Sequence, residues 1–301
     1  MDIRPFDKTK ADYERYVSLR NSIITDQPAS VSFEQRFDDE WPADLVHERL
    51  LIDGADGRAL AGAEYNPLLW SDQPRKFGFN IFVRQDARRQ GLGTRLYRHI
   101  LQELAGHAPI GFETKTREDW PDGVQFLENR GYQLVNRQQQ SELDPASFDA
   151  ARFAETMASV AASGLVLKTL GQVLEADPAA LRRLYDLEIA VMPDVPWYSE
   201  MSARPFDQWA RSYKDNSDLL TGGYIVALDG EEIAGLSQLW GSQATDTLLY
   251  TGFTGVKRPY RQRGLATAMK VRALQYAQTL VASDGSPPRI VTSNEESNPM
   301  L

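Results

Sequence analysis

The chain has 301 residues, 42% of them hydrophobic and 25% charged, which suffices for the cores of two domains of ordinary size. It contains no cysteine, which excludes disulfides and thiolate chemistry. Its three histidines do not stand at the spacing that metal ligands have. The formal charge of −9 argues against non-specific nucleic-acid binding, and no apolar run resembles a signal peptide or membrane span. We therefore expect a cytoplasmic protein that is a monomer or homodimer, without a metal, nucleic-acid or membrane partner.

In chain order, the first half predicts alternating helices and strands. Helices are expected near 9–24, 32–40, 91–104 and 122–132, and strands at 50–65 (a hairpin with an Asp-Gly turn), 75–83, 110–116 and 132–143. A helix at 147–164 would connect to the second half, which predicts helices at 180–192 and 264–281, a hairpin at 222–240 and strands at 247–256 and 288–294. This order indicates a mixed α/β sheet in each half.

The two halves are related by a fixed offset. Arg88 and Arg261 are 261 − 88 = 173 residues apart. The same offset links Phe33 with Phe206, Asp56-Gly57 with Asp229-Gly230, Ala61-Gly62 with Ala234-Gly235, and Val83 with Val256. A constant offset without a gap indicates a duplicated domain. We therefore predict an N-terminal domain at 1–143, a linker helix at 144–164 and a C-terminal domain at 165–301.

The second copy stops early. Adding 173 to Gly131, which closes the last helix of the first copy, gives 304, a position beyond Leu301. The fifth strand of the second copy would then lack a cover. We therefore expect either that the natural protein continues past Leu301 or that another segment completes this copy.

Each copy carries a basic, glycine-containing loop between a strand and a helix, RRQGLG at 88–93 and RQRGLA at 261–266. The first turn of a helix has free N–H groups and the positive end of the dipole, so such a loop can hold phosphate. A capped surface turn is the alternative for one copy alone, but two copies in matching context favour phosphate. A dinucleotide site is a weaker alternative, because Leu96 replaces the third glycine of that fingerprint although Glu113 follows at a suitable distance.

The pattern [QR]-x-x-G-x-[GA] after a strand ending in valine resembles the pyrophosphate motif of the GNAT acetyltransferase superfamily. FLENRGY and TSNEESNPM extend the resemblance, which covers most of the chain as a tandem pair. It implies an α/β fold (α+β mixed sheet) of two tandem GNAT acyltransferase domains, with acetyl-CoA as cofactor. Carried over, the cofactor-binding positions are Phe82, Val83, Arg88, Arg89, Gln90, Gly91, Leu92, Gly93, Thr94, Gly255, Val256, Arg261, Gln262, Arg263, Gly264, Leu265, Ala266, Thr267, Asn294 and Asn298. We call 88–94 the first cradle and 261–267 the second cradle.

Two departures from the family bear on catalysis. Neither fourth strand contains the glutamate that often serves as base, and Leu127 stands where many members have a tyrosine acid. The remaining catalytic candidates are Glu113 and Tyr250, whose alternatives are a solvated strand end and a half-buried strand aromatic. We expect the second copy to carry the chemistry.

Aromatic residues cluster where the family builds its acceptor site. The expected substrate-binding residues are Asp194, which would attract an amine, and Trp197, Tyr198, Phe206 and Trp209. The alternative is that the aromatic rings fix a loop to the core. Together the resemblance predicts an acetyl-CoA-dependent N-acetyltransferase acting on a small-molecule amine. The competing hypothesis is a non-catalytic acyl-CoA-binding or scaffold protein with two degenerate modules.

Overall fold

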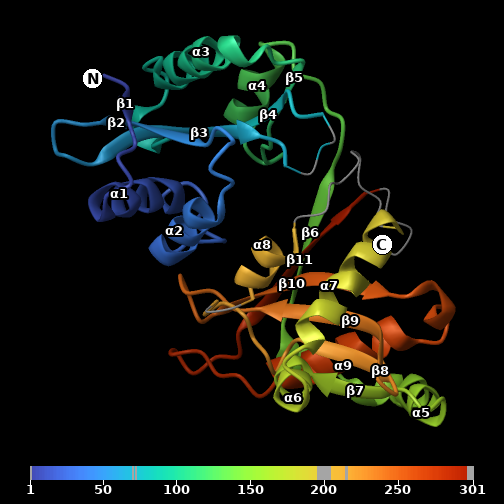
Figure 1. Ribbon diagram of the computed structural model, residues 1–301. Coiled ribbons are helices and arrows are strands. Elements are labelled where there is room, and N and C mark those ends of the chain that lie inside the picture. Colours follow the sequence, from blue (N-terminus) through green and yellow to red (C-terminus); the bar gives the residue numbers. More distant parts are fainter. Residues whose placement is uncertain (1, 70, 72, 195–204, 214–215, 297–301) are drawn as a thin grey trace. The chain divides into compact units, whose positions relative to one another are not determined.

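The computed structural model describes residues 2–69, 71, 73–194, 205–213 and 216–296. The chain divides into two compact units, and the division lies between Asn136 and Arg137. Each unit is built around one mixed sheet (Figure 1). Within the described ranges, no helix is long and apolar enough to cross a membrane.

The first unit has a five-stranded sheet in the order β1-β2-β3-β4-β5. Its elements are β1 (Arg4–Pro5), α1 (Lys10–Asn21), α2 (Val31–Glu40), β2 (Glu48–Asp53), β3 (Ala59–Pro67), β4 (Lys76–Val83), α3 (Leu92–Leu104), β5 (Gly111–Glu113) and α4 (Pro121–Glu128). All neighbouring strands are antiparallel except β4 and β5, which are parallel.

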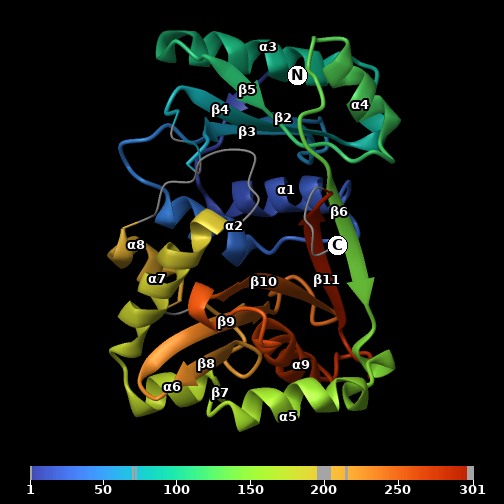
Figure 2. The same ribbon diagram turned by 90° about the vertical axis from the view of Figure 1, so that its right-hand side faces the viewer.

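Alternation along β4 separates the two cores of this unit. Phe77 and Phe79 pack with the apolar face of α3, including Leu96 and Ile100. Phe82 points to the opposite face and packs in the cluster of α1. Figure 2 shows α3 and α1 on opposite sides of the sheet. The period of two in the strand therefore gives one face to α3 and the other to α1 and α2.

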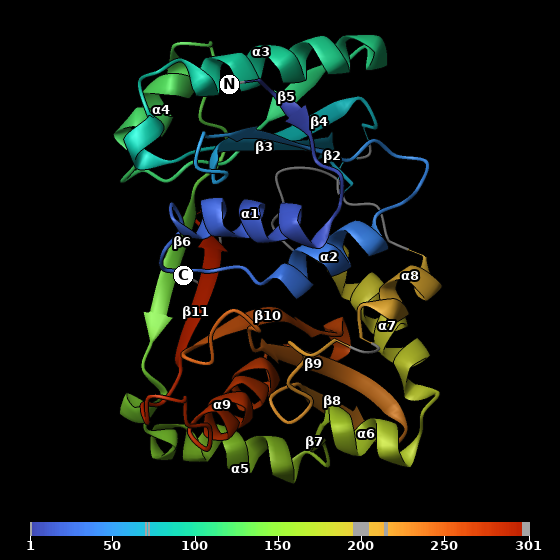
Figure 3. The same ribbon diagram turned by 90° about the vertical axis from the view of Figure 1, so that its left-hand side faces the viewer.

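The second unit has a six-stranded sheet in the order β6-β11-β10-β9-β8-β7. Its elements are β6 (Gln138–Leu143), α5 (Ala154–Ala162), β7 (Val166–Thr169), α6 (Leu170–Ala176), α7 (Ala180–Val191), α8 (Phe206–Arg211), β8 (Ile225–Asp229), β9 (Glu232–Trp240), β10 (Leu248–Val256), α9 (Leu265–Ala277) and β11 (Arg289–Glu295). The core on one face contains residues of α5 and α9, and the core on the other contains residues of α6, α7 and α8 (Figure 3).

The duplication is exact where the cradles are built. β3 and β9 correspond at the offset of 173, and so do α3 and α9. The short 3₁₀ turns that precede the cradles, Gln85–Ala87 and Arg258–Tyr260, obey the same offset. The structure thus confirms two modules of mixed α/β fold.

The strand at the end of the first copy belongs to the second sheet. β6 pairs antiparallel with β11, from Leu143 opposite Ile290 to Gln138 opposite Glu295 (Figure 1). The expectation that this strand closes the N-terminal module is therefore wrong, and the division falls before Arg137 rather than after residue 143. The segment 144–164 is likewise part of the second unit, because Val160 of α5 is buried in its core. β6 is thus the neighbour of β11 on the side away from β10.

Candidate functional site

Both sheets fork at their parallel strand pair. β4 pairs with β5 only from Lys76 to Gly78, and β10 pairs with β11 only from Leu248 to Tyr250. Beyond these short ladders, the described strands give β4 and β10 no neighbour on that side. The carbonyl of Phe79 accepts from Thr114 Oγ1 at 2.8 Å. The backbone of β4 after this residue and of β10 from residue 251 therefore offers peptide groups to an extended ligand, as far as the valine that ends each strand, whose carbonyl is bonded within the chain.

The cradles have the same unusual backbone. Gly91 and Gly264 are the N-cap residues of α3 and α9, with φ of +82° and +74°. Two residues earlier, Arg89 and Gln262 also have positive φ, +64° and +60°. A non-glycine residue in this region costs about 1 kcal/mol or more, and the same strain appears at matched positions in both copies. The conformation leaves the first N–H groups of the helix without intrahelical partners, as anion binding requires.

The first arginine of each cradle is anchored to the preceding strand. Arg88 Nε donates to the carbonyl of Val83 at 3.3 Å, and Arg261 Nε donates to the carbonyl of Val256 at 2.9 Å. From the sequence, these arginines were expected to contribute only positive charge. Their first contribution in the structure is to hold the loop against the strand end, and both residues are exposed.

The first cradle is open and strongly basic. Arg88 to Gly91 are exposed, and a Cβ added at Gly91 would meet nothing within 4 Å. Arg130, at the end of the helical segment α4, donates from Nη2 to Thr94 Oγ1 at 2.8 Å and from Nη1 to the Phe126 carbonyl at 2.7 Å. Sequence reasoning missed Arg130, although it directly precedes the closing glycine in NRGY. It brings a further positive charge to the first turn of α3.

The second cradle is partly taken by its own chain. Asp194 lies 2.7 Å from Arg258 Nη2 and 2.5 Å from Arg261 Nη2. These hydrogen bonds, from Arg258 first and Arg261 second, lower the pKa of Asp194 to about 2. A Cβ at Gly264 would stand 2.6 Å from Cγ2 of Thr156 on α5. Asp194 was expected to attract an amine, and the structure instead pairs it with the cradle.

Glu113 lies where the first sheet forks. It is the last residue of β5 and is opposite Gly78, two residues before Asn80 on β4, so it shares the sheet face of α1 and α2. One oxygen, Oε1, is 3.5 Å from Lys76 Nζ. The other, Oε2, is buried and has no hydrogen-bond partner among the described residues. A carboxylate oxygen without a donor beside an open strand edge can accept a proton.

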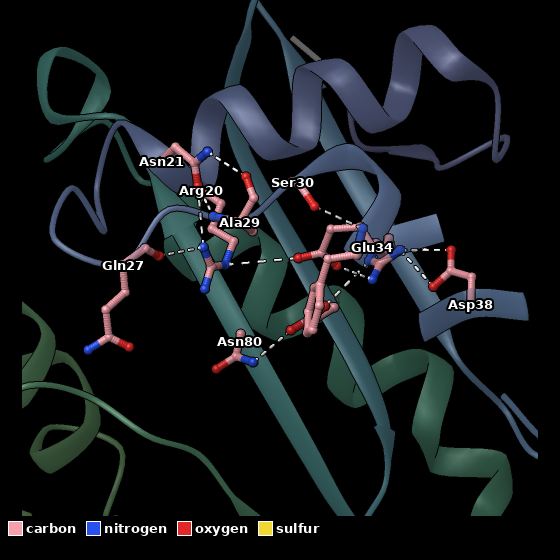
Figure 4. A network of polar contacts seen from close by, with 11 residues as sticks. Arg20, Asn21, Gln27, Ala29, Ser30, Glu34, Asp38 and Asn80 are labelled. Carbon is pink, nitrogen blue, oxygen red and sulfur yellow. Dashed lines mark hydrogen bonds and ion pairs between the residues drawn. The ribbon is translucent and has the colours of Figure 1, made fainter. Parts of the chain in front are cut away.

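A buried network of charges lies on the same face of the first sheet (Figure 4). Arg49 on β2 donates at 2.7 Å to Asp38 and at 2.5 Å to Glu34, both on α2. Its Nε is 3.4 Å from Glu64 on β3, which also accepts a 2.7 Å bond from Asn80 on β4. Sequence reasoning looked for a carboxylate on the fourth strand. The structure supplies Glu64 from the third strand, directly opposite Asn80.

Glu34 predicts a pH dependence of folding. Burial raises the pKa of Glu34 from its ordinary 4.5 to about 7, and Arg49 offsets only part of this shift. Since the folded state binds the proton more tightly, its stability is greatest below pH 4.5 and falls by about 3 kcal/mol as pH rises to 7. We expect Glu34→Gln to flatten that loss, measured by chemical denaturation with hydrogen exchange of the β2 and β3 amides. The matched control is the exposed Glu14→Gln, and equal slopes in all three proteins would contradict the prediction.

The corresponding face of the second unit is filled by aromatic side chains. Glu188 on α7 is buried and accepts hydrogen bonds from Trp209 Nε1 and Tyr213 Oη, each at 2.7 Å, and from Gln238 Nε2 at 2.9 Å. Trp209 is only 4% exposed. The ring of Trp209 therefore presents almost no surface to a substrate. Its position fits the alternative, in which the ring fixes its segment to the core. Phe206 packs edge-on against Tyr185.

The other predicted residues have mixed positions. Tyr250 is the last β10 residue paired with β11, so it lies at the second fork. Asn294, expected among the cofactor-binding positions, lies within β11, opposite Gln139 of β6. Trp197, Tyr198 and Asn298 lie outside the described residues. Across the described residues, no group of three or more His, Cys, Asp or Glu side chains could hold a metal ion.

Comparisons with known proteins agree with this geometry. Residues 16–132 match the model of the acetyltransferase (GNAT) family. A GCN5-related N-acetyltransferase from Sphaerobacter thermophilus superimposes with a TM-score of 0.64 at 16% identity, covering 99% of this chain and 88% of the other. A tandem GNAT protein from the clavulanic acid biosynthesis pathway gives 0.69 at 14% identity, covering 99% and 90%.

A third structure matches only part of its own chain. The glucosamine N-acetyltransferase region of a fungal multi-domain β-N-acetylglucosaminidase gives a TM-score of 0.66 at 11% identity, covering 96% of this chain and 35% of that one. The curated proteins contain no match. At these identities the superpositions establish the fold, and the tandem arrangement is shared over nearly the whole chain.

Proposed function

The chain is a tandem protein of the GNAT acetyltransferase fold whose N-terminal unit belongs to the acetyltransferase (GNAT) family, and on this premise we propose that it transfers an acetyl group from acetyl-CoA to the amine of a small molecule. The observation that carries the proposal is the duplicated cradle beside a forked sheet. The open space at Gly91 and the exposed start of α3 fit a pyrophosphate.

We place the reaction in the N-terminal module, although the sequence favoured the second. Only the first cradle is open at its glycine, and Glu113 brings a buried carboxylate oxygen to the fork. In the second unit, Asp194 pairs with the cradle arginines and Trp209 is buried. The N-terminal unit is also the part of the chain that matches the family model.

Different residues of the first unit would bind the cofactor and accept the proton. The amides of Gln90 to Thr94 would bind the pyrophosphate, with Arg88, Arg89 and Arg130 supplying positive charge. The free edge of β4 would hold the pantetheine arm. When bound, acetyl-CoA supplies an activated thioester carbonyl. Glu113 Oε2 would accept the proton that the amine loses as its nitrogen bonds to the acetyl carbon. The bond from that carbon to sulfur would then break, and the CoA thiolate would leave and take up a proton from solvent.

The test is amine-dependent release of free CoA. The full-length protein is incubated with acetyl-CoA and a panel of amines that includes glucosamine, polyamines and amino acids, and thiol is measured with a chromogenic disulfide. The chain has no cysteine to interfere. We expect at least one amine to raise release well above hydrolysis. If CoA binds in calorimetry but no amine accelerates release, the scaffold hypothesis replaces the enzyme. If NAD competes with CoA for binding, the result supports the hypothesis of a dinucleotide site.

A further inference from the structure

The two cradles share a backbone but differ in their charge environment. The helices before this position, α1 and α7, are offset by 180 − 10 = 170 residues, so the position in the first unit that matches Asp194 is Ile24. Ile24 carries no charge. The first cradle therefore receives no carboxylate from this position, whereas the second receives one. The first cradle has an ion pair elsewhere, between Arg89 and Asp122, but it is longer, at 3.6 Å, and more exposed than the pair between Arg261 and Asp194.

Asp194 bonds the second cradle as an anion would. Its Oδ1 accepts from Arg258 Nη2 at 2.7 Å and its Oδ2 accepts from Arg261 Nη2 at 2.5 Å. Arg261 also keeps its bond to Val256, so Nε and Nη2 of its guanidinium both have protein partners. A carboxylate that spans Arg261 of the cradle and the preceding Arg258 occupies guanidinium donors that a phosphate could also use. Its negative charge also repels phosphate from the start of α9.

We propose that Asp194 is an intramolecular competitor for the phosphates of CoA, and that the second cradle is a latent cofactor site which this carboxylate holds closed. The inference rests on the proposed CoA site of the first cradle, whose backbone the second cradle reproduces. Ion pairs between exposed side chains contribute little to stability, and Arg258 is 76% exposed. A single substitution of Asp194 should therefore open the second cradle without unfolding the protein.

The experiment is calorimetric titration of the full-length protein with CoA. We expect one equivalent to bind to the wild type, and two to Asp194→Asn. In the Gly91→Val background, which disables the first cradle, Asp194→Asn should tighten the remaining site about tenfold. Asp194→Glu keeps the charge and should leave the second site closed. Asp186→Asn is the matched control, because Asp186 is an exposed acid on α7 paired with Arg182.

The outcomes separate this inference from the proposed function. One equivalent in both wild type and Asp194→Asn overturns the competitor role but keeps the first CoA site. Two equivalents of similar affinity in the wild type also overturn it. No binding to either protein overturns both proposals. Binding that appears only in Asp194→Asn supports the competitor role and removes the first cradle from the proposed function.

Discussion

Replacing Gly91 by valine is expected to lower the affinity for CoA at least about 100-fold and to remove acetyl transfer. Gly91 has φ of +82°, which a β-branched residue adopts only with strain. Apart from its chain neighbours, no protein atom lies within 4 Å of an added Cβ, so the side chain would enter the space where we propose that the phosphates bind rather than clash with the fold. Calorimetry with CoA and the thiol-release rate measure the two effects.

Gly264→Val is the corresponding variant of the second cradle, because Gly264 holds the same position with a φ of +74°. Its added Cβ would stand 2.6 Å from Cγ2 of Thr156, so a check of folding is part of this control. If the N-terminal module carries the reaction, this variant keeps both CoA binding and transfer, provided that far-ultraviolet circular dichroism shows a folded protein. Loss of transfer in folded Gly264→Val, with transfer retained in Gly91→Val, would move the reaction to the second module.

Replacing Glu113 by glutamine is expected to lower kcat about 100- to 1,000-fold and to leave the KM for acetyl-CoA nearly unchanged. The amide keeps the size of the side chain but cannot take the proton of the attacking amine. Lys76, 3.5 Å away, remains to interact with the amide oxygen, so the fork should keep its shape. Initial rates over a matrix of both substrate concentrations separate kcat from KM.

The control for this variant is Glu128→Gln, on the exposed side of α4, which should retain the wild-type rate. A Glu113→Gln protein with unchanged kcat would assign proton removal elsewhere. Glu64, hydrogen-bonded to Asn80, would then be the next carboxylate to substitute. A parallel rise in KM for acetyl-CoA would show that Glu113 shapes the cofactor groove instead.

The cradles were predictable from sequence because they are local. Each consists of consecutive residues between a strand and a helix, and the offset of 173 located the second from the first. The positions of Gly91 and Gly264 with positive φ follow from the same short pattern. The duplicated α/β fold was predictable for the same reason, because the hydrophobic periodicity that identifies each helix and strand lies within a short stretch of sequence.

The surroundings of the cradles depend on contacts between distant segments. Asp194 reaches Arg261 from 67 residues away, and Arg130 reaches Thr94 from 36 residues away. Contacts between residues so far apart leave no periodic pattern in the sequence. The same reason hid Glu64, because antiparallel pairing decides which side chain stands opposite Asn80. An acidic residue near aromatic ones looked like an amine site until the structure showed which cations it meets.

The pairing of β6 with β11 also sets an order of events during synthesis. Leu143 leaves the ribosome well before its partner Ile290, so β6 waits about 7 to 30 seconds at ordinary translation rates. Its sequence, QQQSEL, is polar and nearly all exposed. The first unit can fold at once, whereas the second sheet is completed only when the last strand arrives and closes a long loop.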